Sequence, residues 1–84
     1  MQITETWSIS YERIAAFFSV QEDVRAEGEG RYFFGGCEIR LTPLPPRRVG
    51  RFCFPQTRAE FDGPEEDRDT IHRRFVLQFI SAGG

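Results

Sequence analysis

The side chains of this chain best suited to binding chemistry are arginines. All eleven basic residues are Arg, and the chain has no Lys. Four of them, Arg40, Arg47, Arg48 and Arg51, surround a proline-rich stretch in the middle of the chain. A guanidinium presents N–H donors in a planar fork and binds a carboxylate or phosphate through two parallel hydrogen bonds. We therefore expect these four side chains to bind an acidic partner.

The two cysteines, Cys37 and Cys53, and the single histidine, His72, are the other reactive side chains. They lack the CxxC spacing of a zinc site, and no third group near them completes a nucleophile and base. The acidic run between residues 65 and 69 lacks the alternating ligands of a calcium loop. We expect no metal, no cofactor and no catalytic residue, and therefore a non-catalytic binding module. The sequence leaves open whether the two thiols are free or paired.

The last four residues are Ser81-Ala82-Gly83-Gly84. Two terminal glycines have no side chain and free backbone dihedral angles, as a threading tail needs. This ending resembles the C-terminus of the ubiquitin-like sulfur carriers. The resemblance implies that the terminal carboxylate is adenylated and converted to a thiocarboxylate, with Gly83 and Gly84 as the tail. A sulfur or acyl carrier is therefore the alternative function.

Two further patterns near the arginines relate to partners. Residues 43–48, PLPPRR, match the PxxPxR pattern that aromatic-grooved domains bind, although prolines also protect sheet edges from pairing. Phe33, Phe52 and Phe54 lie close by in sequence, and exposed aromatics beside arginines hold single-stranded RNA on some sheets. Because the net charge is −2 and the ribonucleoprotein signatures are missing, we expect these phenylalanines in the core. The expected partner is a protein, or a second copy at an edge strand, and not nucleic acid.

Length and composition restrict the architecture. The 84 residues allow one domain, residues 1–84, and 39% hydrophobic with 29% charged residues is typical of a globular chain. No basic segment and apolar run precede the domain, and the apolar stretches are far shorter than the roughly 20 residues of a membrane span. We expect a cytoplasmic protein with reduced thiols and no membrane attachment.

Hydrophobic periodicity predicts the elements that position these residues. Alternation over residues 3–9 predicts a strand, and Ser10 followed by apolar residues three and four apart predicts a helix over 11–18. Residues 31–41 and 49–54 predict two more strands. Gly35-Gly36 interrupts the first with a bulge, and the prolines of residues 43–46 form an extended connection outside the sheet.

Residues 71–80 fit two patterns. Ile71, Phe75, Leu77 and Phe79 alternate with His72, Arg74, Val76 and Gln78, which predicts a strand. Ile71, Phe75 and Phe79 also lie four apart, as in a helix. Strand propensity favours the strand. The sequence thus predicts an α+β fold of order β-α-β-β-β, with three or four antiparallel strands and one helix on one face. A helix over 64–73 would instead give the ferredoxin-like order β-α-β-β-α-β.

Overall fold

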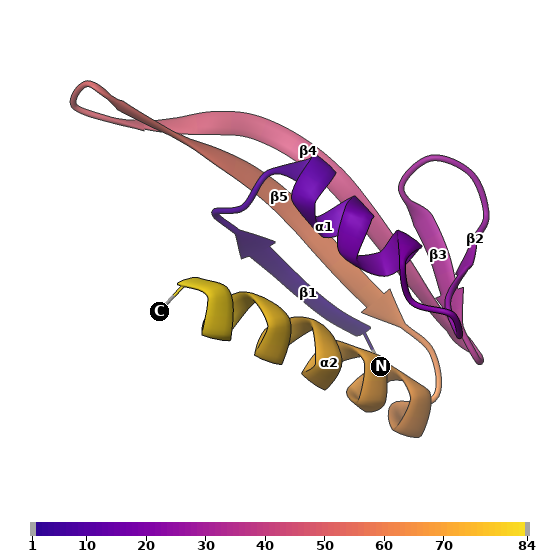
Figure 1. The fold of residues 1–84 in the computed structure, drawn as a ribbon. Coiled ribbons are helices and arrows are strands. Elements are labelled where there is room, and N and C mark those ends of the chain that lie inside the picture. Colours follow the sequence, from indigo (N-terminus) through magenta and orange to yellow (C-terminus); the bar gives the residue numbers. More distant parts are fainter. Residues whose placement is uncertain (1, 84) are drawn as a thin grey trace.

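The computed structural model describes residues 2–83, with side chains through Ile80. Its elements are β1 (Gln2–Trp7), α1 (Tyr11–Ser19), β2 (Arg25–Ala26), β3 (Arg31–Phe34), β4 (Cys37–Val49), β5 (Phe52–Asp62) and α2 (Glu65–Gly83). The strands form one antiparallel sheet in the order β1-β5-β4-β3-β2. Strands β4 and β5 run past the other strands as a long two-stranded hairpin (Figure 1).

The α+β class with an antiparallel sheet is confirmed, but the expected strand count and order are wrong. Within residues 2–83 the sheet has five strands, and the element order is β-α-β-β-β-β-α. This is neither of the two orders that the sequence predicted. The difference has three sources. The short strand β2 was not predicted, each glycine-containing segment at an end of β4 is a hairpin turn, and the last element is a helix.

The segment 71–80 lies in helix α2, so the prediction of a strand is wrong. Ile71 and Phe75 are fully buried, whereas Leu77 is 59% exposed although a strand would place it on the same face. Three acidic residues in the first turn stabilise the helix through its dipole, and Pro64 directly precedes the helix. Packing at every fourth residue therefore overrides the strand propensity of the segment.

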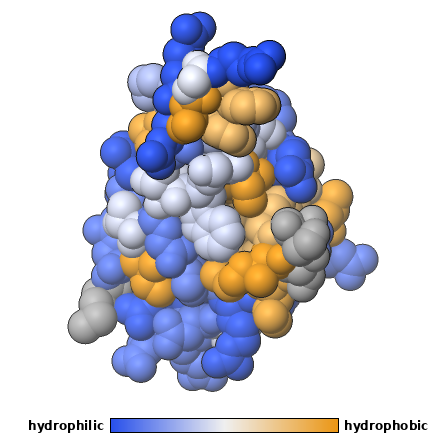
Figure 2. Space-filling view, turned by 90° about the vertical axis from the view of Figure 1, so that its left-hand side faces the viewer, coloured by the Kyte–Doolittle hydropathy of each residue, from blue (hydrophilic) through white to orange (hydrophobic). Residues whose placement is uncertain are grey.

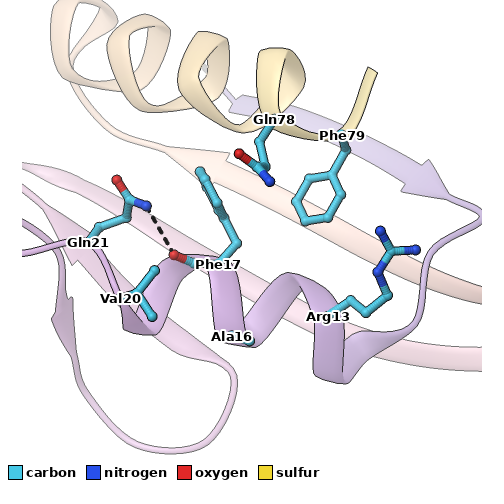
Figure 3. Close-up of a pocket in the computed structure, with 7 residues that line it drawn as sticks. All are labelled: Arg13, Ala16, Phe17, Val20, Gln21, Gln78 and Phe79. Atoms are coloured by element: carbon cyan, nitrogen blue, oxygen red, sulfur yellow. Dashed lines mark hydrogen bonds between the residues drawn. The ribbon is translucent and has the colours of Figure 1, made fainter. Parts of the chain in front are cut away.

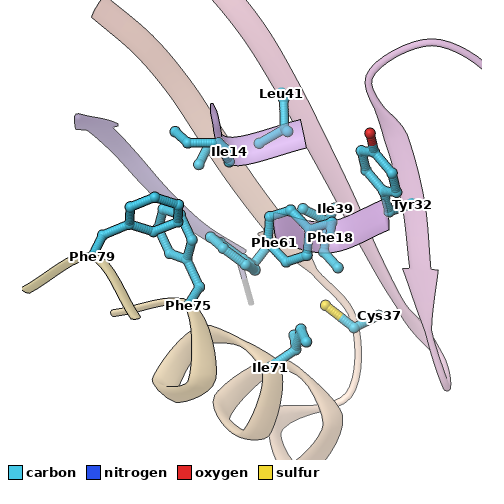
Figure 4. Close-up of a cluster of buried hydrophobic side chains, with 11 residues drawn as sticks. Ile14, Phe18, Tyr32, Cys37, Ile39, Leu41, Phe61, Ile71, Phe75 and Phe79 are labelled. Atoms are coloured by element: carbon cyan, nitrogen blue, oxygen red, sulfur yellow. The ribbon is translucent and has the colours of Figure 1, made fainter. Parts of the chain in front are cut away.

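The core lies between the helices and one face of the sheet. Helix α1 is confirmed: Ser10 Oγ accepts a hydrogen bond from the Arg13 backbone N–H at 3.3 Å, and Ile14 and Phe18 are fully buried. The ring centroid of Phe75 on α2 lies 5.7 Å from that of Phe18 and 5.6 Å from that of Phe61 on β5 (Figure 4). These aromatic contacts join both helices to the same face of the sheet.

Gly35 and Gly36 form the turn between β3 and β4 rather than a bulge within one strand. Phe34 pairs with Cys37, so these two glycines alone connect the strands. Gly35 has φ +56°, a left-handed conformation that favours glycine, and the Gly36 backbone N–H donates to Asp67 Oδ2 at 2.9 Å. The turn is thereby attached to the first turns of α2.

A second hairpin turn divides the predicted strand 49–54. Strand β4 ends at Val49 and β5 begins at Phe52, with Gly50 at φ +62° between them. The prolines of residues 43–46 lie within β4, so the expectation of a connection outside the sheet is also wrong. They are tolerated because this part of β4 pairs only with β5, and the register shifts between Leu44 and Arg47.

Candidate anion-binding hairpin

The candidate site is the projecting part of the β4–β5 hairpin, residues 43–56, which we call the hairpin end. It contains three of the four arginines singled out in the sequence: Arg47, Arg48 and Arg51, the hairpin arginines. Arg47 pairs with Phe54 and Arg48 with Cys53, and Arg51 lies in the turn. Figure 2 shows the hairpin end at the top of the molecule, where hydrophilic and hydrophobic side chains lie together.

The structure separates Arg40 from the hairpin arginines. Arg40 lies in the central part of the sheet, seven residues before Arg47, or about 23 Å at roughly 3.3 Å per residue. Its Nε lies 3.7 Å from Glu38 Oε2, which also accepts a hydrogen bond from Arg31 Nε at 2.9 Å. Arg40 therefore belongs to an ion-paired cluster on the body of the sheet.

Within the described part of the chain, no ion pair or hydrogen bond joins the side chains of the hairpin arginines to another residue. All three are exposed, and residues 43–56 contain no carboxylate. Since the whole chain carries −2 and the hairpin end carries +3, the remaining residues carry −5. The molecule thus has a cationic end and an acidic body.

Two exposed aromatic rings lie beside these charges. Phe52 is 62% and Phe54 43% exposed, and their ring centroids are 6.4 Å apart with planes 27° from parallel. The expectation that these rings belong to the core is wrong. Thr57 and other buried residues of β5 point towards the helices, so alternation places Phe52 and Phe54 on the opposite face, which no described helix covers.

The third phenylalanine of that group, Phe33 on β3, is half-buried and also packs outside the core cluster. The guanidinium carbons of Arg25 and Arg31 lie 5.2 and 5.6 Å from its ring centroid. These guanidiniums already occupy the space over the ring. Phe33 is therefore less available to a partner than the two rings of the hairpin end.

Both thiols are free, which answers the question that the sequence left open. Cys53 is exposed on the hairpin end, opposite Arg48. Cys37 is fully buried, and desolvation of its thiolate raises the pKa of Cys37 to about 11. Cys37 is therefore protonated near neutral pH and is a poor nucleophile.

The predicted carrier tail, Gly83 and Gly84, would be an extended segment. Gly83 is instead the last residue of helix α2. Gly84 lies outside the described residues. The carrier alternative stays a prediction from the sequence.

Sequence reasoning missed a polar cluster that joins β1 to α2. Glu5 Oε1 accepts a hydrogen bond from Trp7 Nε1 at 3.0 Å and lies 3.0 Å from His72 Nε2. The ring of Phe61 packs edge-on against His72. Because Glu5 and His72 are 67 residues apart, no local pattern in the sequence indicated this contact. The cluster holds α2 against the sheet.

A shallow groove of about 380 Å³ separates α1 from α2 (Figure 3). Phe17 and Phe79 line it, and the Arg13 guanidinium carbon lies 5.9 Å from the Phe79 ring centroid. The Gln21 amide in this groove already donates to the Phe17 carbonyl and accepts from Arg74. The Gln21 amide is thus satisfied within the fold, and most of the groove wall is apolar.

Among the residues whose side chains are described, no group of His, Cys, Asp and Glu is arranged to hold a metal ion. No described helix is both long and apolar enough to cross a membrane. No protein-family model matches the chain, and no curated protein is significantly similar to it.

Proposed function

We propose that this protein is a small non-catalytic binding module whose hairpin end binds an acidic partner. The observation that carries the proposal is the set of three exposed hairpin arginines, whose side chains pair with no other described residue, on a projection that contains no carboxylate. An arginine that already holds a carboxylate, as Arg74 holds Asp23 at 2.8 Å, must exchange that contact to bind another anion. The hairpin arginines have no such contact to exchange.

The projection also keeps an acidic partner away from the acidic body. The next carboxylate along β5 is that of Glu60, six positions after Phe54, or about 20 Å away at roughly 3.3 Å per residue. Charges interact weakly beyond a Debye length of about 8 Å at physiological salt. An anion at the hairpin end therefore experiences the three positive charges much more strongly than the −5 of the body.

Strand addition fits the hairpin end poorly, because prolines lie along both of its free edges. Pro43, Pro45 and Pro46 lie on β4 and Pro55 lies on β5, and none of them has a backbone N–H to donate. The outer edge of β1 contains no proline and is the edge that a second copy would extend in self-association. Two free thiols, one of them exposed, suit the reducing cytoplasm, where we place the protein.

The test of this proposal is retention on a heparin column at low salt, with elution by a salt gradient. Despite its net charge of −2, the native chain is retained, and the Arg47→Gln/Arg48→Gln double variant elutes at clearly lower salt. Arg73→Gln removes the same kind of charge from an exposed position on α2 and elutes with the native chain. A native chain that flows through, or a double variant that elutes with it, rejects the proposal.

A further inference from the structure

We infer, on the basis of the proposed function, that the acidic partner is a single-stranded nucleic acid. Its bases stack on Phe52 and Phe54, and its phosphates bind Arg47 on the same face and Arg51 in the turn. The sequence predicted a protein partner and not nucleic acid, because the net charge is −2 and the phenylalanines were expected in the core. The hairpin end instead carries +3, and both of its rings are exposed. Single-strand binding needs exposed aromatic faces next to cations that follow the phosphate backbone. The hairpin end combines both on a few residues of one ribbon.

The two rings are arranged as a stacking platform. Phe52 and Phe54 are two residues apart on β5 and therefore point to the same face of the ribbon. They pack outside the core cluster, and Figure 1 shows no helix over this part of the hairpin. Every nucleobase has a π face, so such rings accept bases with little sequence preference.

The arginines lie close to where the phosphates of a bound strand would be. Arg47 lies directly across from Phe54 on the same face of the ribbon. Arg48 pairs with Cys53 and points to the other face, while Arg51 lies in the turn beside Phe52. A strand with its bases on the two rings therefore lies on the face of Arg47 and next to the turn that holds Arg51, while Arg48 points away from it.

Other anionic partners fit this geometry less well. Insertion into a membrane would push the turn in first, and the turn consists of Gly50 and the charged Arg51, with the rings behind it. A protein strand cannot easily extend the ribbon, because prolines interrupt its free edges. In a duplex the bases are already stacked on each other and are not available to Phe52 and Phe54.

The charge distribution predicts a small footprint and a defined salt dependence. Two neutralised phosphates on a single strand, one at Arg47 and one at Arg51, give a slope of about −1.4 for log K against log salt, at roughly 0.7 per phosphate. The acidic body adds no further phosphate contacts. Arg47→Gln should reduce the slope to about −0.7, whereas Arg48→Gln should leave it unchanged.

The experiment is fluorescence anisotropy of the full chain with a short labelled oligothymidylate at several salt concentrations. An abasic strand of equal length keeps the phosphates but lacks the bases, and a duplex of equal length keeps both but hides the base faces. The oligothymidylate binds more tightly than either. Phe52→Ala/Phe54→Ala lowers its affinity about tenfold or more and leaves the salt slope unchanged.

Leu77→Ala is the matched control, because it removes a similarly exposed apolar side chain from α2 and changes neither quantity. Circular dichroism verifies that each variant is folded. Equal binding of the abasic strand, or unchanged affinity of the double Phe variant, overturns the inference. So does a polyglutamate peptide or an anionic vesicle that binds as tightly as the oligothymidylate. In these cases retention on heparin still supports the proposed function. If the chain neither binds the oligothymidylate nor is retained on heparin, both the inference and the proposed function are rejected.

Discussion

Replacement of Phe75 by alanine, compared with Leu77→Ala, measures whether the last element packs as a helix. Phe75 is fully buried and its ring lies within 6.3 Å, centroid to centroid, of five other aromatic rings, those of Trp7, Phe17, Phe18, Phe61 and Phe79. Loss of a buried phenylalanine ring costs about 3–5 kcal/mol through lost burial and the remaining cavity. A domain of 84 residues has a total stability of roughly 4–13 kcal/mol, so this change removes a large fraction of it.

Leu77 is two residues further along and 59% exposed, so Leu77→Ala should change the free energy of unfolding by no more than about 0.5 kcal/mol. Urea denaturation followed by far-UV circular dichroism measures both changes. Circular dichroism is preferable to fluorescence because the Trp7 ring lies 5.0 Å from that of Phe75 and its emission will change in the variant. Similar losses for the two variants would mean that both side chains share a buried face, as in a strand, and would refute the packing argument.

Further predictions concern a close backbone approach and the two thiols. A Cβ at Gly63 would lie 2.6 Å from Cys37 Cα, so Gly63→Ala should lower the melting temperature by several degrees, and an unchanged value would contradict the contact. Iodoacetamide should label Cys53 in the folded protein and Cys37 only after denaturation; rapid labelling of both would show that Cys37 is accessible. Because the folded-state pKa of Cys37 is about 11, above its ordinary value of 9.0, the unfolded thiol ionises first as pH rises. Stability should therefore fall from about pH 9 to pH 11, and this part of the pH dependence should disappear in Cys37→Ala.

The first half of the molecule could be predicted well from local patterns. Alternation over residues 3–9 and the cap at Ser10 depend on neighbours in the sequence, and both β1 and α1 formed as expected. The Gly35-Gly36 pair was harder to interpret. Gly35 suits a bulge or a turn equally well, and only the pairing of Phe34 with Cys37 distinguishes them.

Of the candidate site, the sequence indicated the arginines but not their grouping. Arg40 and Arg47 are both close to the prolines in sequence, yet they lie seven positions apart on the extended strand β4 and are therefore far apart in space. The exposure of Phe52 and Phe54 was not predictable either. A phenylalanine in an alternating segment is buried only where another layer covers that face, and no local signal shows that the hairpin extends beyond the helices.

The sequence alone determined the α+β class, the capped first helix and the concentration of positive charge in one segment, because each depends on residues close together in the chain. Only the tertiary structure decided that residues 71–80 are helical and that the hairpin end projects with its rings exposed. Helix and strand differ little in local preference for a segment such as Phe75–Phe79, so contacts with Phe18 and Phe61, far away in sequence, select between them.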